Sequence, residues 1–220
     1  MTHRVLCALV ATAALAVARP AAAQAHDVGD WSILGAETVK PGSDVIYGAF
    51  GWPDASFGFT HGMNPNFDLG FRFSLVYGVE NTTTSQFGIA AAMPLRWAFG
   101  RPGNVHLLFH FDPGLRLYTY DPTPFGFQFP VGLNLEFLTR APFKFGLGAD
   151  FNMSLFVTGG REPEFVFGPL FGPFLEYHVD RQLAIGFDTR FGAIIDAASS
   201  PSETVTRFGF RAQLLLAYRL

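Results

Sequence analysis

A two-residue alternation of apolar and polar side chains is the feature that most constrains how this chain can fold. From residue 67 to residue 195 the odd positions carry mostly Phe, Leu and other apolar residues, while the even positions carry mostly small, polar or charged residues. In the last segment the apolar parity shifts to the even positions, from Phe208 to Leu220. Successive side chains of a β-strand point to opposite faces, so the pattern indicates strands with one apolar face. Helical periodicity is missing, and the sequence therefore predicts an all-β chain.

Turn-forming clusters of Pro, Gly, Asn and Asp divide the alternation into ten strands. We predict these strands at residues 44–52, 55–62, 67–78, 86–99, 104–118, 125–138, 143–157, 164–179, 183–196 and 205–220. Short turns and longer loops alternate between them, so one end of the sheet carries mostly turns and the other mostly loops. Because Asp112-Pro113-Gly114 could form a turn, and residues 31–39 could pair as well, eight or twelve strands remain alternatives.

The first 25 residues are predicted to be a cleaved secretory signal peptide. Arg4 precedes an apolar run from Val5 to Val17, and small residues follow with cleavage patterns that end at Ala23 or Ala25. The apolar run is too short for a membrane helix, which needs about 20 residues. Residues 26–42 are then expected to form a periplasmic N-terminal segment ahead of a barrel at residues 43–220.

The composition limits the class of protein. Only 15% of the residues are charged, whereas about 25% is usual for a soluble domain, so a water-facing surface would lack charge. The formal net charge of -3 argues against nucleic acid as a partner, because nucleic-acid binding needs a basic face. Cys7 is the only cysteine and lies in the predicted signal peptide, so the mature chain would have no disulfide and no cysteine metal ligand.

The number of aromatic rings decides which face of the sheet points outward. Most of the 26 Phe residues share the apolar face, and the interior of a small barrel is only just wide enough for ordinary side chains. We therefore predict a transmembrane antiparallel up-and-down β-barrel of about ten strands, with its apolar face toward lipid and its polar face toward the lumen.

The lumen face is predicted to carry a structural network of charges. Its candidate members are Asp68, Arg72, Arg96, His106, His110, Asp112, Arg116, Glu136, Lys144, Asp150, Glu176, Asp188, Arg190 and Arg211. Antiparallel hairpins are expected to bring together three pairs of opposite charge. These pairs are Asp68 with Arg96, Glu136 with Lys144, and Asp188 with Arg211. Such a network would fill the lumen instead of forming a selective channel.

Amphipathic aromatic residues fall near the predicted strand ends, as in the two girdles of a membrane barrel. On the loop side these residues are Trp52, Tyr77, Tyr118 and Tyr120, and on the turn side Trp97, Tyr177 and Tyr218.

Residues 43–220 resemble the small outer-membrane β-barrel proteins of Gram-negative bacteria, of the OmpA/OmpW-like kind. The signal peptide, the even strand count, the contrast between turns and loops, and the last strand, from Phe208 to Leu220, carry the resemblance. In that family the last strand is read by the barrel-assembly machinery and usually ends in Phe, whereas this chain ends in Leu220. The resemblance implies an outer-membrane location, with membrane lipid, lipopolysaccharide and the assembly machinery as partners.

Few residues indicate chemistry. His106 and His110 would lie about 13 Å apart on a strand at about 3.3 Å per residue, too far for one zinc ion, so we expect two polar lumen residues and no metal site. His110 and Asp112 share the lumen face, but no nucleophile elbow, phosphate loop or dinucleotide-binding motif is present, so no catalytic residue and no cofactor are predicted.

The expected function is that of a non-enzymatic barrel, either structural or a narrow, largely occluded, porin-like pore for small solutes. Two alternatives remain open: a membrane-embedded enzyme that acts on outer-membrane lipid through His110 and Asp112, and a secreted binding barrel of lipocalin type.

Overall fold

The chain folds into a single closed β-barrel, here described from a computed structural model. The structure describes residues 30–78, 87–100, 105–119, 123–137, 142–160, 162–197 and 204–220. The strands are β1 (Asp44–Trp52), β2 (Asp54–Asn64), β3 (Phe67–Val76), β4 (Gly88–Ala92), β5 (Leu95–Gly100), β6 (Val105–Phe111), β7 (Gly114–Tyr118), β8 (Pro124–Gln128), β9 (Val131–Phe137), β10 (Phe143–Thr158), β11 (Glu164–His178), β12 (Leu183–Ala197) and β13 (Val205–Arg219). No helix in these ranges is long and apolar enough to cross a membrane.

Three of the barrel strands are each interrupted once by a proline. β4 and β5 form one strand, as do β6 with β7 and β8 with β9, and the interruptions contain Pro94, Pro113 and Pro130. Proline has no N–H group and cannot donate to the ladder. Its carbonyl still accepts: Gly70 N–H donates to Pro94 O at 2.8 Å, and Met93 N–H donates to Pro113 O at 2.8 Å. The thirteen segments are therefore ten barrel strands, as predicted.

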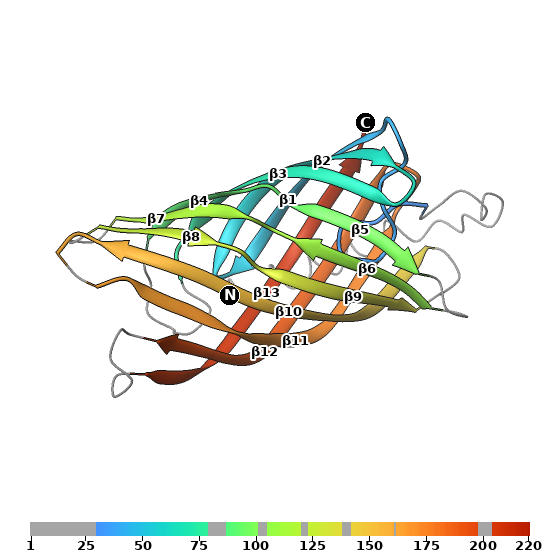
Figure 1. Ribbon diagram of the computed structural model, residues 1–220. Helices are drawn as coiled ribbons and strands as arrows, with labels where there is room; N and C mark the ends of the chain where they lie inside the picture. The colour runs from blue at the N-terminus through green and yellow to red at the C-terminus, as the bar shows by residue number, and fades with distance from the viewer. Residues whose placement is uncertain are drawn as a thin grey trace, which may run out of the picture.

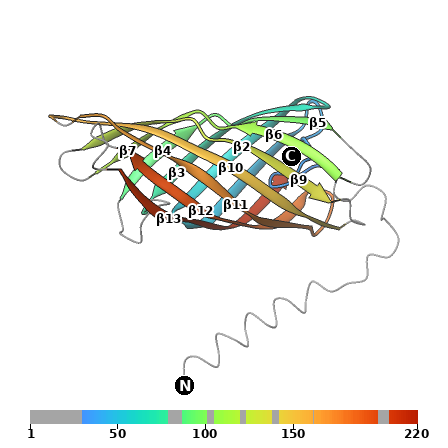
Figure 2. The same ribbon diagram turned by 60° about the horizontal axis from the view of Figure 1, so that its bottom comes forward.

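All neighbouring strands are antiparallel, and the first strand pairs with the last. β1 pairs with β13 from Val45 opposite Arg219 to Trp52 opposite Ala212, which closes the barrel and leaves the sheet without a free edge. The strands run obliquely to the long axis of the barrel, as Figures 1 and 2 show. We call the end where β1 begins and β13 ends the turn end, and the opposite end the loop end. The predicted all-β barrel of ten strands is confirmed.

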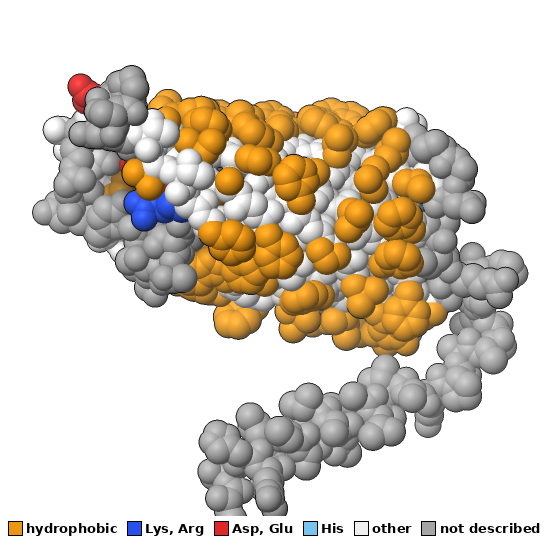
Figure 3. Space-filling model, turned by 90° about the horizontal axis from the view of Figure 1, so that it is seen from below, with side chains coloured by type: hydrophobic (Ala, Val, Ile, Leu, Met, Phe, Trp, Pro, Cys, Tyr) orange, Lys and Arg blue, Asp and Glu red, His pale blue; other side chains and the backbone are white. Residues whose placement is uncertain are grey.

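The two faces of the wall have opposite character. Exposed hydrophobic side chains, most of them Phe and Leu, form an apolar belt on the outer surface, and Phe50 and Phe71 are 68% and 53% exposed. Figure 3 shows one face of this belt. Charged side chains face inward and are buried, among them Asp68, Glu176 and Arg190. A lipocalin-type barrel needs the reverse arrangement, with an apolar interior and a polar exterior, so the described wall does not fit that alternative.

Residues 30–40, which precede β1, lie inside the turn end of the barrel. Residues 30–40, which we call the plug, run as irregular backbone in the part of Figure 1 where β13 and the C-terminus also lie. Trp31 and Val39 are completely buried. The predicted signal peptide lies outside the described residues, and the periplasmic location of residues 26–42 stays a prediction.

One side of the lumen is apolar and packs against the plug. Trp31 and Val39 join Val45 of β1 and Leu215 of β13 in a buried cluster, and Ile33 and Leu34 pack against it. These apolar residues of β1 and β13 point into the lumen, so the two strands that close the barrel depart from the pattern of polar residues inside and apolar residues outside. The plug is therefore held by apolar burial on this side and by polar contacts on the other.

Candidate functional site in the barrel lumen

An ion-pair network crosses the middle of the lumen. Asp150 of β10 lies at its centre: Arg211 Nη2 lies 2.6 Å from one carboxylate oxygen, and His110 Nε2 lies 3.0 Å from the other. Arg211 also lies 3.1 Å from Asp188, which pairs with Arg190. The predicted proximity of Asp188 and Arg211 is thus present in the structure, and their strands are in register at Arg190 and Arg211.

The network continues to the opposite wall. His110 Nδ1 lies 3.8 Å from Asp112, and Asp112 lies 3.5 Å from Arg72 of β3. Both ring nitrogens of His110 therefore face carboxylates, which is an ion-pair geometry. A catalytic histidine would instead need one nitrogen directed at a nucleophile or a substrate.

Glycine on the lumen face makes room for these side chains. A Cβ atom at Gly148 of β10 would lie 1.9 Å from Arg190 Nη2, and one at Gly132 of β9 would lie 2.3 Å from His110 Nε2. A cavity lined by Arg72, Asp112 and other network residues remains beside them, with a volume of about 110 Å³.

Nearer the turn end, wall carboxylates hold the backbone of the plug. Glu176 of β11 accepts from the Ile33 and Leu34 N–H groups at 3.1 and 3.0 Å and from the Ser32 hydroxyl at 2.9 Å. Glu136 of β9 accepts from Ala36 N–H at 2.7 Å. In the same way, Asp68 of β3 accepts from Val39 N–H at 3.0 Å. Three strands thus satisfy buried N–H groups that have no ladder partner.

Wall donors hold the carbonyl groups of the same segment. Arg96 of β5 donates to the carbonyls of Ser32, Gly35 and Glu37 at 2.8, 3.1 and 3.2 Å. Arg96 also contacts Asp68 at 3.0 Å, and the two face each other in register, as the sequence predicted. The Asn134 side chain donates to Leu34 O at 2.9 Å. The plug is therefore recognised mainly through its backbone.

The pairing predicted between Glu136 and Lys144 is displaced in the structure. Glu136 lies opposite Gly146, and Lys144 lies opposite Glu176, so the hairpin register differs by two residues from the prediction. Lys144 Nζ is 3.9 Å from Glu136 but makes its shorter contact with Glu37 of the plug. Counting residues across a hairpin identifies partners within the barrel wall only, so it could not identify Glu37 of the plug as a partner of Lys144.

The ends of the plug are fixed at the rim. Trp31 Nε1 donates to Arg181 O at 3.1 Å, and its ring packs edge-on against His178 with centroids 5.0 Å apart. Asp30 contacts Lys40 and lies 2.6 Å from Arg219 Nη1. Burial would raise the pKa of Asp30, but the hydrogen bonds from Lys40 and Arg219 outweigh burial and hold that pKa below its ordinary value.

The predicted girdle residues do not all share one environment. Trp97 and Tyr218 are exposed on the outer face near the turn end, and Trp52 and Tyr77 pack together with ring centroids 6.3 Å apart. Tyr118 is a correction: it is only 2% exposed and accepts a hydrogen bond from Arg116 at 3.2 Å inside the barrel. Tyr118 shares the even parity of Arg116, so alternation turns it inward. Tyr177 packs against Phe143, and Tyr120 lies outside the described residues.

The plug is the part of the lumen that the sequence reasoning missed. Two signals were available: Trp31, Ile33 and Leu34 form an apolar group ahead of the first strand, and the run Leu214–Ala217 of β13 is apolar on both faces. Apolar residues on both faces of a strand indicate that another part of the chain also covers the face that points into the lumen.

No family model and no curated protein matches the chain. Among solved structures, the crystal structure of the N-terminal β-barrel domain of Pseudomonas aeruginosa OprF is similar. The sequences are 9% identical, the match covers 83% of this chain and 100% of that one, and the TM-score is 0.32. So low a score adds nothing to the closed ten-strand barrel that the strand pairing establishes.

Proposed function

We propose that this chain is a non-enzymatic integral outer-membrane β-barrel whose lumen is closed by its own N-terminal segment. The proposal rests on the character of the two faces of the wall. The outer face carries an apolar belt, and the inner face encloses ion pairs and a plug that is bound through its backbone. Lipid is the environment that makes an exposed Phe and Leu belt favourable. A filled lumen fits a structural barrel or a very narrow pore better than an open channel.

The proposal also covers the export of the protein, its assembly into the membrane and its partners there. The signal peptide directs export, β13 is read by the assembly machinery, and membrane lipid and lipopolysaccharide surround the belt. The support for the role of β13 is that its pairing with β1 closes the barrel.

Two measurements test the proposal. The protein should stay with the membrane after carbonate extraction, and recovery in the soluble periplasmic fraction would refute the location. In planar bilayers the refolded full-length protein should conduct little or no current, because the plug and the ion-pair network occupy the lumen. A large, steady conductance from the wild-type protein would refute closure.

The alternative of a lipid-modifying enzyme depends on His110 and Asp112. Substitution of His110 by Gln should leave the lipid composition of the outer membrane unchanged, because His110 belongs to an ion-pair network. A change in lipid acylation or headgroup in that variant would favour the enzyme instead.

A further inference from the structure

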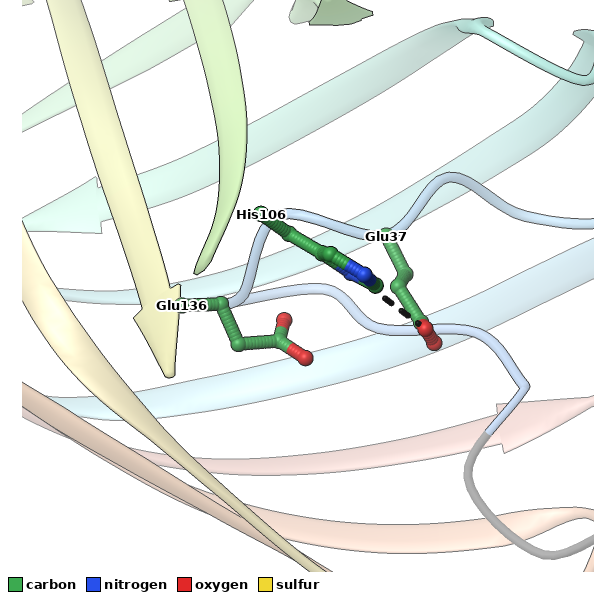
Figure 4. A group of neighbouring side chains, drawn as sticks. All are labelled: Glu37, His106 and Glu136. Atoms are coloured by element: carbon green, nitrogen blue, oxygen red, sulfur yellow. Dashed lines mark ion pairs between the residues drawn. The ribbon is translucent and has the colours of Figure 1, made fainter. Parts of the chain in front are cut away.

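Three side chains of metal-ligand type meet where the plug touches the barrel wall. Glu37 belongs to the plug, His106 to β6 and Glu136 to β9 (Figure 4), and one ligand atom from each lies within 4.8 Å of the other two. His106 and Glu136 are directly opposite each other in the β6–β9 ladder. The two wall residues are thus preplaced by strand pairing, and the plug supplies the third.

The spacing of these atoms is close to that of a zinc site. Zinc bonds of about 2.0–2.1 Å in a tetrahedron place neighbouring ligand atoms about 3.3 Å apart. His106 Nδ1 lies 3.5 Å from Glu37 Oε1, as the dashed line in Figure 4 marks. Small side-chain rotations would bring Glu136 to the same distance. One imidazole and two carboxylates leave a fourth position for water.

Both carboxylates are oriented by further hydrogen-bond donors. Lys144 contacts Glu37 through Oε2, which leaves Oε1 facing His106. Ala36 N–H donates to Glu136 Oε2 at 2.7 Å, and Oε1 lies 3.9 Å from Lys144. Donors that hold the outer oxygen of a ligating carboxylate are a general feature of metal sites, because they fix the orientation of the ligand.

The charges around residues 32–39 of the plug also favour the binding of a further cation. In the described part of the chain, three wall carboxylates contact residues 32–39, namely Glu176, Glu136 and Asp68. Glu37 of the plug adds a fourth carboxylate. Arg96 and Lys144 are the permanent cations that contact them, and His178 Nε2 lies 3.0 Å from Glu176. Buried carboxylates are costly without a counter-charge. A divalent cation would supply two positive charges at Glu37 and Glu136, in place of protons on the nearby imidazoles.

We propose that Glu37, His106 and Glu136 form a zinc-binding site that fastens the plug to β6 and β9. The mixture of imidazole nitrogen and carboxylate oxygen suits Zn²⁺, whereas Mg²⁺ prefers an octahedral set of oxygens. The distance predicted between His106 and His110 excludes a zinc site that contains both residues, but it does not exclude a site formed by His106 with other ligands. The site adds a metal-dependent fastening to the plug and does not depend on whether the barrel conducts.

The test uses the full-length protein, folded in detergent micelles, treated with EDTA and titrated with ZnCl₂ or MgCl₂. We expect one Zn²⁺ per chain by calorimetry and a rise in the unfolding temperature with Zn²⁺ but not with Mg²⁺. Co²⁺ in the same site should give the visible absorption of a tetrahedral complex. His106→Gln and Glu37→Gln should each weaken Zn²⁺ binding at least tenfold.

The matched control is His61→Gln, because His61 lies at the same end of the barrel but pairs with Asp44 at 2.6 Å. This variant should bind Zn²⁺ as the wild type does. Glu37 belongs to the plug and not to the wall, so Glu37→Gln tests the site even if His106→Gln fails to fold. Absence of one-to-one Zn²⁺ binding, or equal binding by folded Glu37→Gln, would overturn the proposal and leave Lys144 and imidazole protons as the balancing charges.

Discussion

At the scale of single residues, the lumen is organised by charged side chains that each contact more than one partner. Asp150 contacts His110, Arg190 and Arg211, and Arg96 contacts Asp68 and three plug carbonyls. Such groups are expensive to bury singly and tolerable when every lone pair and proton has a partner. The consequence is that single substitutions should cost more than paired ones.

The pair Asp68 and Arg96 provides the clearest test of this view. Arg96→Met strands the Asp68 carboxylate and frees three plug carbonyls, so we expect a loss of about 3–5 kcal/mol in the free energy of unfolding. Asp68→Asn should cost less, because Arg96 keeps its carbonyl partners. The double variant should lose less than the sum, measured by urea unfolding in micelles.

The matched control is Arg207→Met, since Arg207 is half exposed and pairs with Asp196 at 3.1 Å. An exposed ion pair of this kind should cost less than about 1 kcal/mol. Strictly additive losses for Asp68→Asn and Arg96→Met would mean that the two side chains do not stabilise each other.

At the scale of elements, the plug and the wall depend on close backbone approach. A Cβ atom at Gly62 of β2 would lie 2.2 Å from Lys40 O and 2.5 Å from Val39 O, and neither backbone atom can rotate away. Gly48 of β1 has its nearest atom, Ser56 O, at 3.8 Å, which is an ordinary contact. The two glycines therefore differ in whether a methyl group would meet the plug.

Gly62→Ala should displace the plug, whereas Gly48→Ala should leave it in place. Trp31 is completely buried in the wild type, so its fluorescence in a Trp52→Phe, Trp97→Phe background reports displacement through quenching by acrylamide. We expect strong quenching in Gly62→Ala and little in Gly48→Ala. Equal quenching in both variants would show that the contact at Gly62 does not hold the plug.

The start of the plug should also respond to acid. The partners Lys40 and Arg219 keep the pKa of Asp30 below its ordinary value of 3.8, so the charged form stabilises the folded state. This contribution is complete above pH 3.8 and is lost as the pH falls through the lower pKa of the folded protein. Asp30→Asn should remove the contribution at neutral pH, seen as greater quenching of Trp31 at pH 7. In that variant the dependence of quenching on acid should become weaker, and an unchanged acid response would assign the effect to another group.

At the scale of the whole molecule, the antiparallel strands place mostly short turns at one end of the barrel and mostly longer loops at the other. The β1–β2 connection at Pro53 is tight but lies at the loop end. In membrane barrels the short turns are periplasmic and the longer loops are outside. The plug would then close the periplasmic end, where the proposed zinc site also lies.

Labelling on whole cells tests this orientation. A cysteine at Ser200, between β12 and β13, should react with an impermeant thiol reagent, while one at Arg101, between β5 and β6, should react only after the cells are opened. The mature chain is expected to have no other cysteine, so the signal comes from the introduced residue alone. The reverse labelling pattern would place the plug at the outer surface.

The sequence by itself determined where the strands lie and which face of the wall is apolar, and it favoured ten strands over eight or twelve. Alternation is a local property that each strand carries alone, so β1, β10 and β12 begin and end within a residue of the predicted bounds. The pair Asp68 and Arg96 was also predictable, by counting across the connection between their strands. The same counting placed Glu136 opposite Lys144, whereas the structure places it opposite Gly146.

Only the tertiary structure decided what fills the lumen. Ala36 and Glu136 are 100 positions apart in the chain, and no periodicity links them. The plug has no strand pattern because wall side chains, and not a neighbouring strand, satisfy its backbone. The same long-range contact takes Lys144 to Glu37 and brings Glu37, His106 and Glu136 together. Strand formation depends on neighbours along the chain, whereas the closing of this lumen depends on residues that meet only after the barrel has formed.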